Sequence, residues 1–84
     1  GETTYNAVLA NVLNGDNSTR VDTQNLPEGM YLNAIAAARG GNNSEAIKYL
    51  AQAIESNNLF KIEAANDLEF INLRDNEEFI NLIN

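Results

Sequence analysis

The stretch from Gly29 to Asn57, GMYLNAIAAARGGNNSEAIKYLAQAIESN, most constrains how this chain can fold. Its first part is apolar almost all the way round, because Asn33 is the only polar residue from Met30 to Ala38. A helix with so little polar surface is normally enclosed by neighbouring elements. We therefore expect this helix to lie inside the domain, with the rest of the chain packed around it.

Start and stop signals divide the same stretch into two helices. Pro27 favours a helix start, and Gly40 with Gly41 favours a helix end. Ser44 is a candidate N-cap for a second helix, whose apolar residues recur at helical spacing at Ile47, Leu50, Ala51 and Ile54. The connection expected between them is the five-residue turn Gly-Gly-Asn-Asn-Ser, residues 40–44. So short a connection predicts that the two helices run antiparallel and side by side.

Five residues of this hairpin carry a resemblance to a known family. They stand at the spacing of the tetratricopeptide repeat, a helix hairpin of about 34 residues, and are Ala34, Gly41, Ala46, Leu50 and Ala53. The resemblance implies an all-α fold of antiparallel hairpins, a right-handed α-solenoid fragment of about four or five helices. The chain departs from the family pattern at Met30 and Ala37, where aromatic residues are usual. Any antiparallel helix pair with an alanine-rich seam is the alternative.

The chain on either side of the hairpin divides into shorter segments. We expect a helix over residues 3–14 capped by Thr3 or Thr4, a loop over 15–26, the hairpin over 27–57 and C-terminal capping helices over 58–84. The C-terminal run resembles the end of many bacterial tetratricopeptide arrays, through Asp67-Leu68-Glu69-Phe70, Leu73-Arg74 and Phe79. This second resemblance implies that the last helices close an array.

Composition excludes several classes of protein. The 84 residues include neither cysteine nor histidine, and twelve acidic against five basic residues give a net charge of −7. The chain therefore lacks disulfides, thiolate metal sites and the commonest general base. A surface of this sign repels nucleic-acid phosphates and anionic lipids, and no apolar run approaches the roughly 18 residues of a membrane span. We expect no cofactor, no metal, no nucleic-acid partner and no membrane insertion.

The ends of the chain leave its origin open. It begins at Gly1 and not at methionine, so we expect it to be a piece of a longer protein. No signal peptide is present in the sequence. Bacterial cytoplasm and envelope are both compatible with these observations, and the oligomeric state is open as well.

Acidic residues supply the patterns closest to catalytic or calcium chemistry. Six carboxylates follow Ile62, at Glu63, Asp67, Glu69, Asp75, Glu77 and Glu78. Carboxylate pairs can cleave glycosidic bonds, but they need a concave site, for which a domain this small offers little room. Asp16, Ser18 and Asp22 suggest a calcium loop, but Arg20 interrupts them and the required glycine and glutamate positions do not match. We expect no enzyme, and a simple connection over residues 15–26.

Three residues of the first hairpin helix are candidates for partner binding. In tetratricopeptide repeats the first helix of each hairpin lines a concave groove, so the resemblance places Tyr31 and Asn33 there. Asn33 is a candidate to hydrogen-bond a bound backbone, and Arg39 to pair with a carboxylate of the partner. The alternatives are half-buried packing for Tyr31 and a solvent-facing position for Asn33.

The sequence as a whole predicts a non-catalytic interaction or assembly module that binds a peptide or a partner protein. The alternative is a purely structural C-terminal cap of a longer repeat protein, with no ligand of its own. A groove lined by Tyr31, Asn33 and Arg39 would distinguish the first function from the second.

Overall fold

The structure, a computed structural model, describes residues 3–22 and 26–84, and every regular element within them is helical. In chain order these are α1 (Tyr5–Leu13), α2 (Pro27–Arg39), α3 (Asn43–Ser56), α4 (Leu59–Asn66), the 3₁₀ helix η1 (Leu68–Leu73) and α5 (Glu77–Ile83). The predicted all-α class is confirmed. Part of the predicted loop, residues 23–25, lies outside the described residues.

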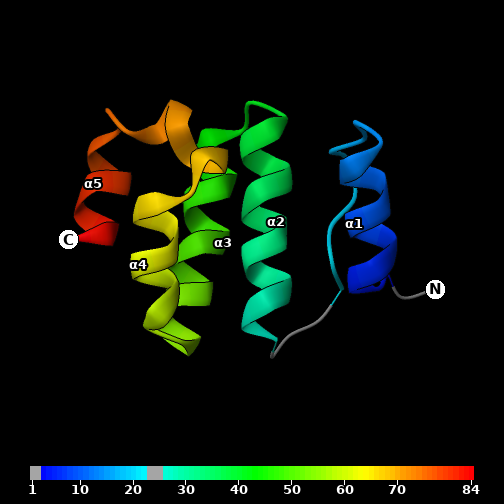
Figure 1. Cartoon of the computed structure of the whole chain (residues 1–84), viewed down its shortest axis with the longest axis horizontal. Helices are drawn as coiled ribbons and strands as arrows, with labels where there is room; N and C mark the ends of the chain where they lie inside the picture. Colours follow the sequence, from blue (N-terminus) through cyan, green and yellow to red (C-terminus); the bar gives the residue numbers. More distant parts are fainter. Residues whose placement is uncertain (1–2, 23–25) are drawn as a thin grey trace.

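Helices α2 and α3 form an antiparallel pair near the middle of the molecule, with the most extensive contact of any two elements (Figure 1). The seam between them is built from alanine side chains that have no exposed surface, at Ala34, Ala37, Ala46 and Ala53. Small side chains let two helix axes approach closely. Leu50, which is also fully buried, fills the remaining space in the larger core.

The turn between α2 and α3 is shorter than the sequence predicts. Gly40 keeps a right-handed backbone at the end of α2, and Gly41 takes a φ of +80°. Helix α3 then begins at Asn43, because the Asn42 side chain accepts a hydrogen bond from the Glu45 backbone N–H at 3.2 Å. The prediction of Ser44 as the N-cap is therefore wrong, since the cap stands two residues earlier.

The cap predicted for the first helix is confirmed at the second of the two candidate threonines. The hydroxyl of Thr4 accepts a hydrogen bond from the Ala7 backbone N–H at 3.2 Å. One of the unpaired N–H groups at the start of α1 is satisfied in this way. Helix α1 accordingly begins at Tyr5, and Asn14 caps its other end.

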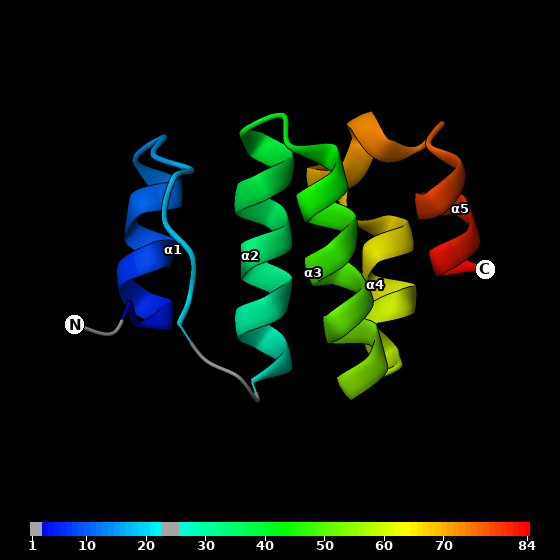
Figure 2. The ribbon, with the colours of Figure 1, turned by 180° about the vertical axis from the view of Figure 1, so that it is seen from behind.

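Two clusters of buried side chains flank α2. The larger lies between α2 and the elements that follow it, and its members include Leu50, Phe70, Leu73 and Phe79. The smaller joins α1 and the chain after it to α2, through Val8, Val12, Val21, Leu32 and Ala36. Figures 1 and 2 show the same order from both sides, with residues 16–22 running between α1 and α2. The prediction that this helix is enclosed is confirmed.

Aromatic rings connect α2 to the C-terminal elements. The ring of Tyr31 stacks on Phe60 of α4 at a centroid distance of 4.9 Å and meets Phe70 of η1 edge to face at 5.6 Å. Phe70 in turn contacts Phe79 of α5 at 6.0 Å. Such pairs contribute roughly 0.5–1.5 kcal/mol each beyond the area they bury. These rings hold the short helices α4, η1 and α5, which are too short to be stable alone.

Replacing Gly41 by alanine should lower the free energy of unfolding by about 1–2 kcal/mol, because a Cβ at positive φ approaches the following carbonyl oxygen. Gly40→Ala is the matched control. A Cβ there makes only ordinary contacts, the nearest 3.4 Å from the Ala36 carbonyl oxygen, so stability should stay unchanged or rise by up to about 1 kcal/mol. Urea unfolding measures both variants, and equal destabilisation of the two would contradict this turn geometry.

Candidate functional site

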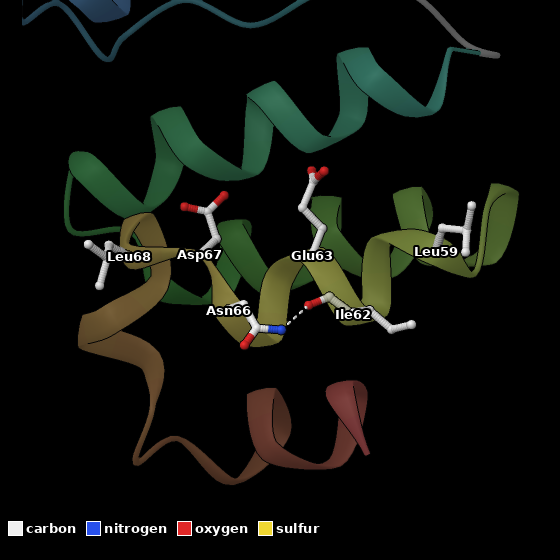
Figure 3. Close-up of a pocket in the computed structure, with 6 residues that line it drawn as sticks. All are labelled: Leu59, Ile62, Glu63, Asn66, Asp67 and Leu68. Atoms are coloured by element: carbon white, nitrogen blue, oxygen red, sulfur yellow. Dashed lines mark hydrogen bonds between the residues drawn. The ribbon is translucent and has the colours of Figure 1, made fainter.

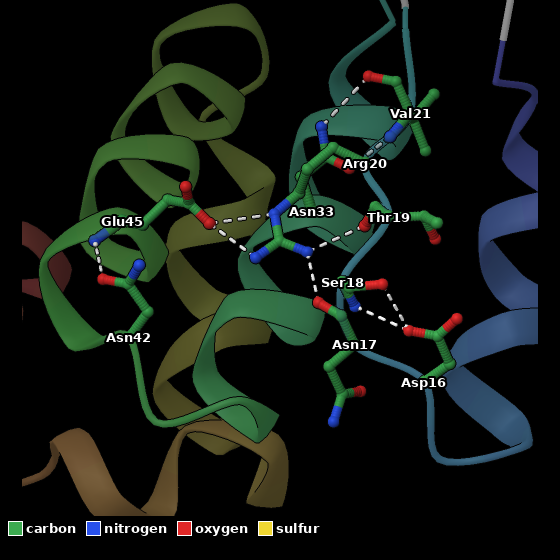
Figure 4. A network of polar contacts seen from close by, with 9 residues as sticks. All are labelled: Asp16, Asn17, Ser18, Thr19, Arg20, Val21, Asn33, Asn42 and Glu45. Atoms are coloured by element: carbon green, nitrogen blue, oxygen red, sulfur yellow. Dashed lines mark hydrogen bonds and ion pairs between the residues drawn. The ribbon is translucent and has the colours of Figure 1, made fainter.

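Asn33 lies in the interior and binds the chain's own backbone. Its side chain is only 1% exposed. The side-chain Oδ1 accepts a hydrogen bond from the Val21 backbone N–H at 2.6 Å, and Nδ2 donates to the Val21 carbonyl oxygen at 3.2 Å (Figure 4). The alternative of a solvent-facing position is therefore wrong. Asn33 does clamp an extended backbone, but that backbone belongs to residues 16–22 and its binding to a separate partner stays a prediction.

Arg20 fixes the same segment to α3. Its guanidinium donates to the Glu45 carboxylate, with Nε 2.9 Å and Nη2 2.5 Å from Oε1. The remaining Nη1 donates to the backbone carbonyl oxygens of Asn17 at 2.6 Å and Thr19 at 2.7 Å (Figure 4). The described part of the predicted loop is thus more than a connection, because hydrogen bonds join it to both helices of the hairpin.

The residues that suggest a calcium loop in the sequence form a local turn. Asp16 Oδ1 accepts hydrogen bonds from the Ser18 hydroxyl at 2.5 Å and from the Ser18 backbone N–H at 3.0 Å. These two bonds, the hydroxyl's first, lower the pKa of Asp16 below its ordinary value. Within residues 3–22 and 26–84, no group of three or more acidic side chains is placed to hold a metal ion.

Arg39 joins three elements of its own chain. Its Nε and Nη2 donate to the two carboxylate oxygens of Glu69 in η1, at 2.8 Å and 2.6 Å, and Nη1 donates to the Val12 carbonyl oxygen in α1 at 3.3 Å. This fork-to-fork pairing is the geometry in which arginine and carboxylate bind most strongly. The expected carboxylate partner of Arg39 is therefore present within the domain, and a contact to a separate protein stays a prediction.

Tyr31 is buried, not half-buried as the alternative for this residue proposed, and its hydroxyl has a specific acceptor within the chain. It donates to Asp67 Oδ2 at 2.7 Å. The pKa of the phenol is raised well above its ordinary value, chiefly by burial. The hydrogen bond to Asp67 and the nearby charges of Asp67, Glu63 and Glu69 raise it further. Tyr31 therefore stays neutral, and its role is to hold the half-buried carboxylate of Asp67.

An open groove of about 680 Å³ runs along α4 beside that carboxylate. We call it the α4 groove, and its lining residues are Leu59, Ile62, Glu63, Asn66, Asp67 and Leu68 (Figure 3). A smaller hollow of about 200 Å³ adjoins it and shares Leu59 and Glu63. The concave surface therefore extends along most of the length of α4.

Three aliphatic side chains of the α4 groove face solvent. Leu59, Ile62 and Leu68 are 70%, 66% and 71% exposed. The face that α4 packs inward carries instead Ala64 and the half-buried Phe60. The sequence offers a signal only in retrospect, because α4 has more large apolar residues than one packed face can hold.

The groove also carries two carboxylates on one side. Glu63 and Asp67 stand four residues apart, a spacing that places two side chains on the same helix face, and Figure 3 shows both directed from α4 toward α2. Asp67 accepts hydrogen bonds from the Tyr31 hydroxyl and from the Glu69 backbone N–H, at 2.7 Å and 3.0 Å. The site therefore combines aliphatic surface with two negative charges.

Replacing Asn33 by alanine should lower the free energy of unfolding by about 2–4 kcal/mol, because the buried N–H and carbonyl groups of Val21 lose their partner. Asn6→Ala, an exposed asparagine on α1, is the matched control and should change stability by less than about 0.5 kcal/mol. Hydrogen exchange of the Val21 amide gives a local measurement. Unchanged protection of that amide in Asn33→Ala would disprove the clamp.

Above pH 10, stability should fall because of Tyr31. Its phenol stays protonated in the folded chain but ionises near its ordinary pKa of 10.0 once unfolded, so the unfolded state gains up to about 1.4 kcal/mol per pH unit beyond that point. Tyr31→Phe should remove this part of the alkaline loss, while Tyr5→Phe, on the exposed side of α1, should leave it unchanged. Urea midpoints between pH 9 and 11.5 measure the effect, and an unaltered slope in Tyr31→Phe would argue against it.

Comparisons with protein-family profiles, with curated proteins and with solved structures give no match for this chain. No helix in the described ranges, 3–22 and 26–84, combines the length and the hydrophobicity needed to cross a membrane. The function proposed below therefore rests on the contacts, exposure and charges of the described residues.

Proposed function

We propose that this domain is a non-catalytic protein-interaction module, and that a segment of a partner protein docks in the α4 groove. The observation that carries the proposal is the exposure of Leu59, Ile62 and Leu68 around one concave surface. Single exposed aliphatic residues are ordinary, but several that gather around a hollow are typical of an interaction site. Covering them with a partner would remove their apolar surface from water.

The architecture we propose is tetratricopeptide-like. The α2–α3 pair with its buried Ala34, Ala46 and Ala53 supports it, since these are three of the residues that carry the family resemblance. In such an array α4 would be the first helix of the next unit, and first helices line the surface that binds partners. Two residues of the groove lining, Glu63 and Asp67, are directed toward α2, which agrees with that arrangement (Figure 3).

The shape and chemistry of the α4 groove favour a polypeptide over a small molecule. Sites for small molecules usually enclose most of their ligand, whereas the groove is open and its aliphatic side chains are mostly exposed. The chain has no histidine or cysteine to serve as base or nucleophile. An elongated segment that lies along α4 would use the surface more fully than a compact ligand.

Tyr31, Asn33 and Arg39 have supporting roles in this proposal. Tyr31 orients Asp67, which lines the groove. Asn33 and Arg39 instead hold α1, the segment after it and η1 against α2. Their substitution would therefore act on partner binding mainly through the framework of the domain.

A structural cap is the second candidate function, and the outer surface of α5 favours it. Glu77, Glu78 and Asn81 are exposed there, next to the end of the described chain. Terminal units of repeat proteins need a polar outer face to stay soluble. A cap and an interaction module differ in the α4 groove, because only the module requires the groove to bind.

Selection of a random-peptide display library on the domain should enrich peptides that depend on the groove. An Ile62→Asp, Leu68→Asp double variant should bind them at least about tenfold more weakly, because charges replace the apolar contact surface. Leu13→Asp is the matched control, since Leu13 is equally exposed at 70% on α1. Circular dichroism checks that each variant stays folded. Enrichment of no peptide, or of peptides that bind the double variant as well as the wild type, would overturn the proposal in favour of a cap.

A further inference from the structure

The side chains of the α4 groove lie in two parallel lines with different chemistry. Leu59, Ile62 and Asn66 follow one another at intervals of three and four residues, so they share one line along the helix. Glu63 and Asp67 form the neighbouring line, on the side toward α2 (Figure 3). A segment lying in this groove would therefore meet aliphatic surface along one edge and negative charge along the other.

Among residues 3–22 and 26–84, no cation forms an ion pair with either of the two carboxylates. Among the described residues the ion pairs are Arg20 with Glu45 and Arg39 with Glu69, and neither includes Glu63 or Asp67. Asp67 is bound by a neutral hydroxyl and a backbone N–H. Asp67 is therefore hydrogen-bonded by neutral groups, but no ion pair of the described residues neutralises the charge of Asp67 or of Glu63.

The nearest cation in the sequence of α4 is directed elsewhere. The ammonium group of Lys61 donates to the Asn84 carbonyl oxygen at 2.8 Å, which ties α4 to the end of α5. Residues 59–84 as a whole contain six acidic against two basic side chains. The electrostatic potential around the groove is therefore negative, and it favours a partner of opposite sign.

The same charges argue against a second copy of this chain as the occupant. Two copies that meet through their α4 grooves would bring Glu63 and Asp67 of each copy together. Close approach of like charges opposes association. Covering the aliphatic line of one molecule with that of another would therefore be opposed by the carboxylate line beside it.

We infer that the occupant of the α4 groove is a cationic amphipathic segment of a partner protein. Its lysine or arginine side chains would lie at Glu63 and Asp67, and its apolar side chains would cover Leu59, Ile62 and Leu68. The inference rests on the proposed docking function of the groove and adds the chemistry of the partner. Amphipathic helical segments commonly dock in apolar grooves through their apolar face, and lysine or arginine beside that face would reach the carboxylate line.

Three synthetic peptides of one length test the inference by calorimetric titration of the whole domain. The first carries a line of leucine along one helical face and a line of lysine directly beside it, the second has glutamate in place of lysine, and the third has serine in place of leucine. The lysine–leucine peptide should bind, and more weakly at high salt. The other two should each bind at least about tenfold more weakly, since each lacks one of the two complementary surfaces.

A matched pair of variants separates local recognition from the overall charge of −7. Glu63→Gln and Glu55→Gln each remove one exposed glutamate, but Glu55 lies on α3 and does not line the groove. Glu63→Gln should weaken the lysine–leucine peptide about two- to fivefold, and Glu55→Gln should leave its affinity nearly unchanged. Equal losses in the two variants, or equal binding of the lysine and glutamate peptides, would overturn the inference.

Failure of the inference is distinguishable from failure of the proposed function. Selected peptides that are neutral or acidic, yet depend on Ile62 and Leu68, would disprove a cationic partner and keep the groove as a docking site. Peptides whose binding does not depend on Ile62 and Leu68 would remove the docking site, and the cationic partner with it.

Discussion

The enclosure of α2 is the constraint on which the rest of the structure depends. One side of this helix packs on α1 and residues 16–22, and the other on α3 and the aromatic cluster of the C-terminal elements. A helix enclosed in this way cannot leave a polar side chain unpaired, because burial without a partner costs about 1–3 kcal/mol. Asn33 satisfies its amide with the Val21 backbone. The same two hydrogen bonds pair the backbone N–H and carbonyl groups of Val21, which lies in a segment outside any helix or sheet.

This constraint also determines which surfaces are free to bind. The side chains of Tyr31 and Arg39 also bind other elements of the chain. Tyr31 donates to Asp67, and Arg39 donates to Glu69 and to a backbone carbonyl at the end of α1. Helix α4 differs from α2 in its burial, because Ala64 is its only fully packed residue and its large aliphatic side chains face outward. Helix α4 is therefore better placed for recognition, with α2 supplying the rigid support behind it. A site whose side chains are held by such a second layer loses less conformational freedom on binding.

Sequence periodicity predicted the hairpin well but not the site, and the reasons are physical. The helix start at Pro27, the helix end at the two glycines and the close alanine contacts follow from the local preferences of these residue types. The α2–α3 pair and its enclosure could therefore be expected from the residues alone. The partner of Asn33 lies twelve positions away and that of Arg39 thirty, and no local pattern encodes such pairings. The orientation of α4 could not be predicted from the sequence, for a related reason. Periodicity identifies an apolar stripe, but whether Ile62 or Ala64 faces the core depends on the neighbours that tertiary packing supplies.

The negative charge of the chain has a local consequence at the α4 groove. Distributed over a surface, a charge of −7 needs no explanation beyond solubility. Next to Leu59, Ile62 and Leu68 the same charges do more, because an exposed aliphatic cluster without them would associate with any apolar surface it met. Glu63 and Asp67 oppose contact with other acidic surfaces, including a second copy of this domain, and they favour a cationic one. Specificity of this kind requires a repulsive element as well as an attractive one, and the lining of the α4 groove has both.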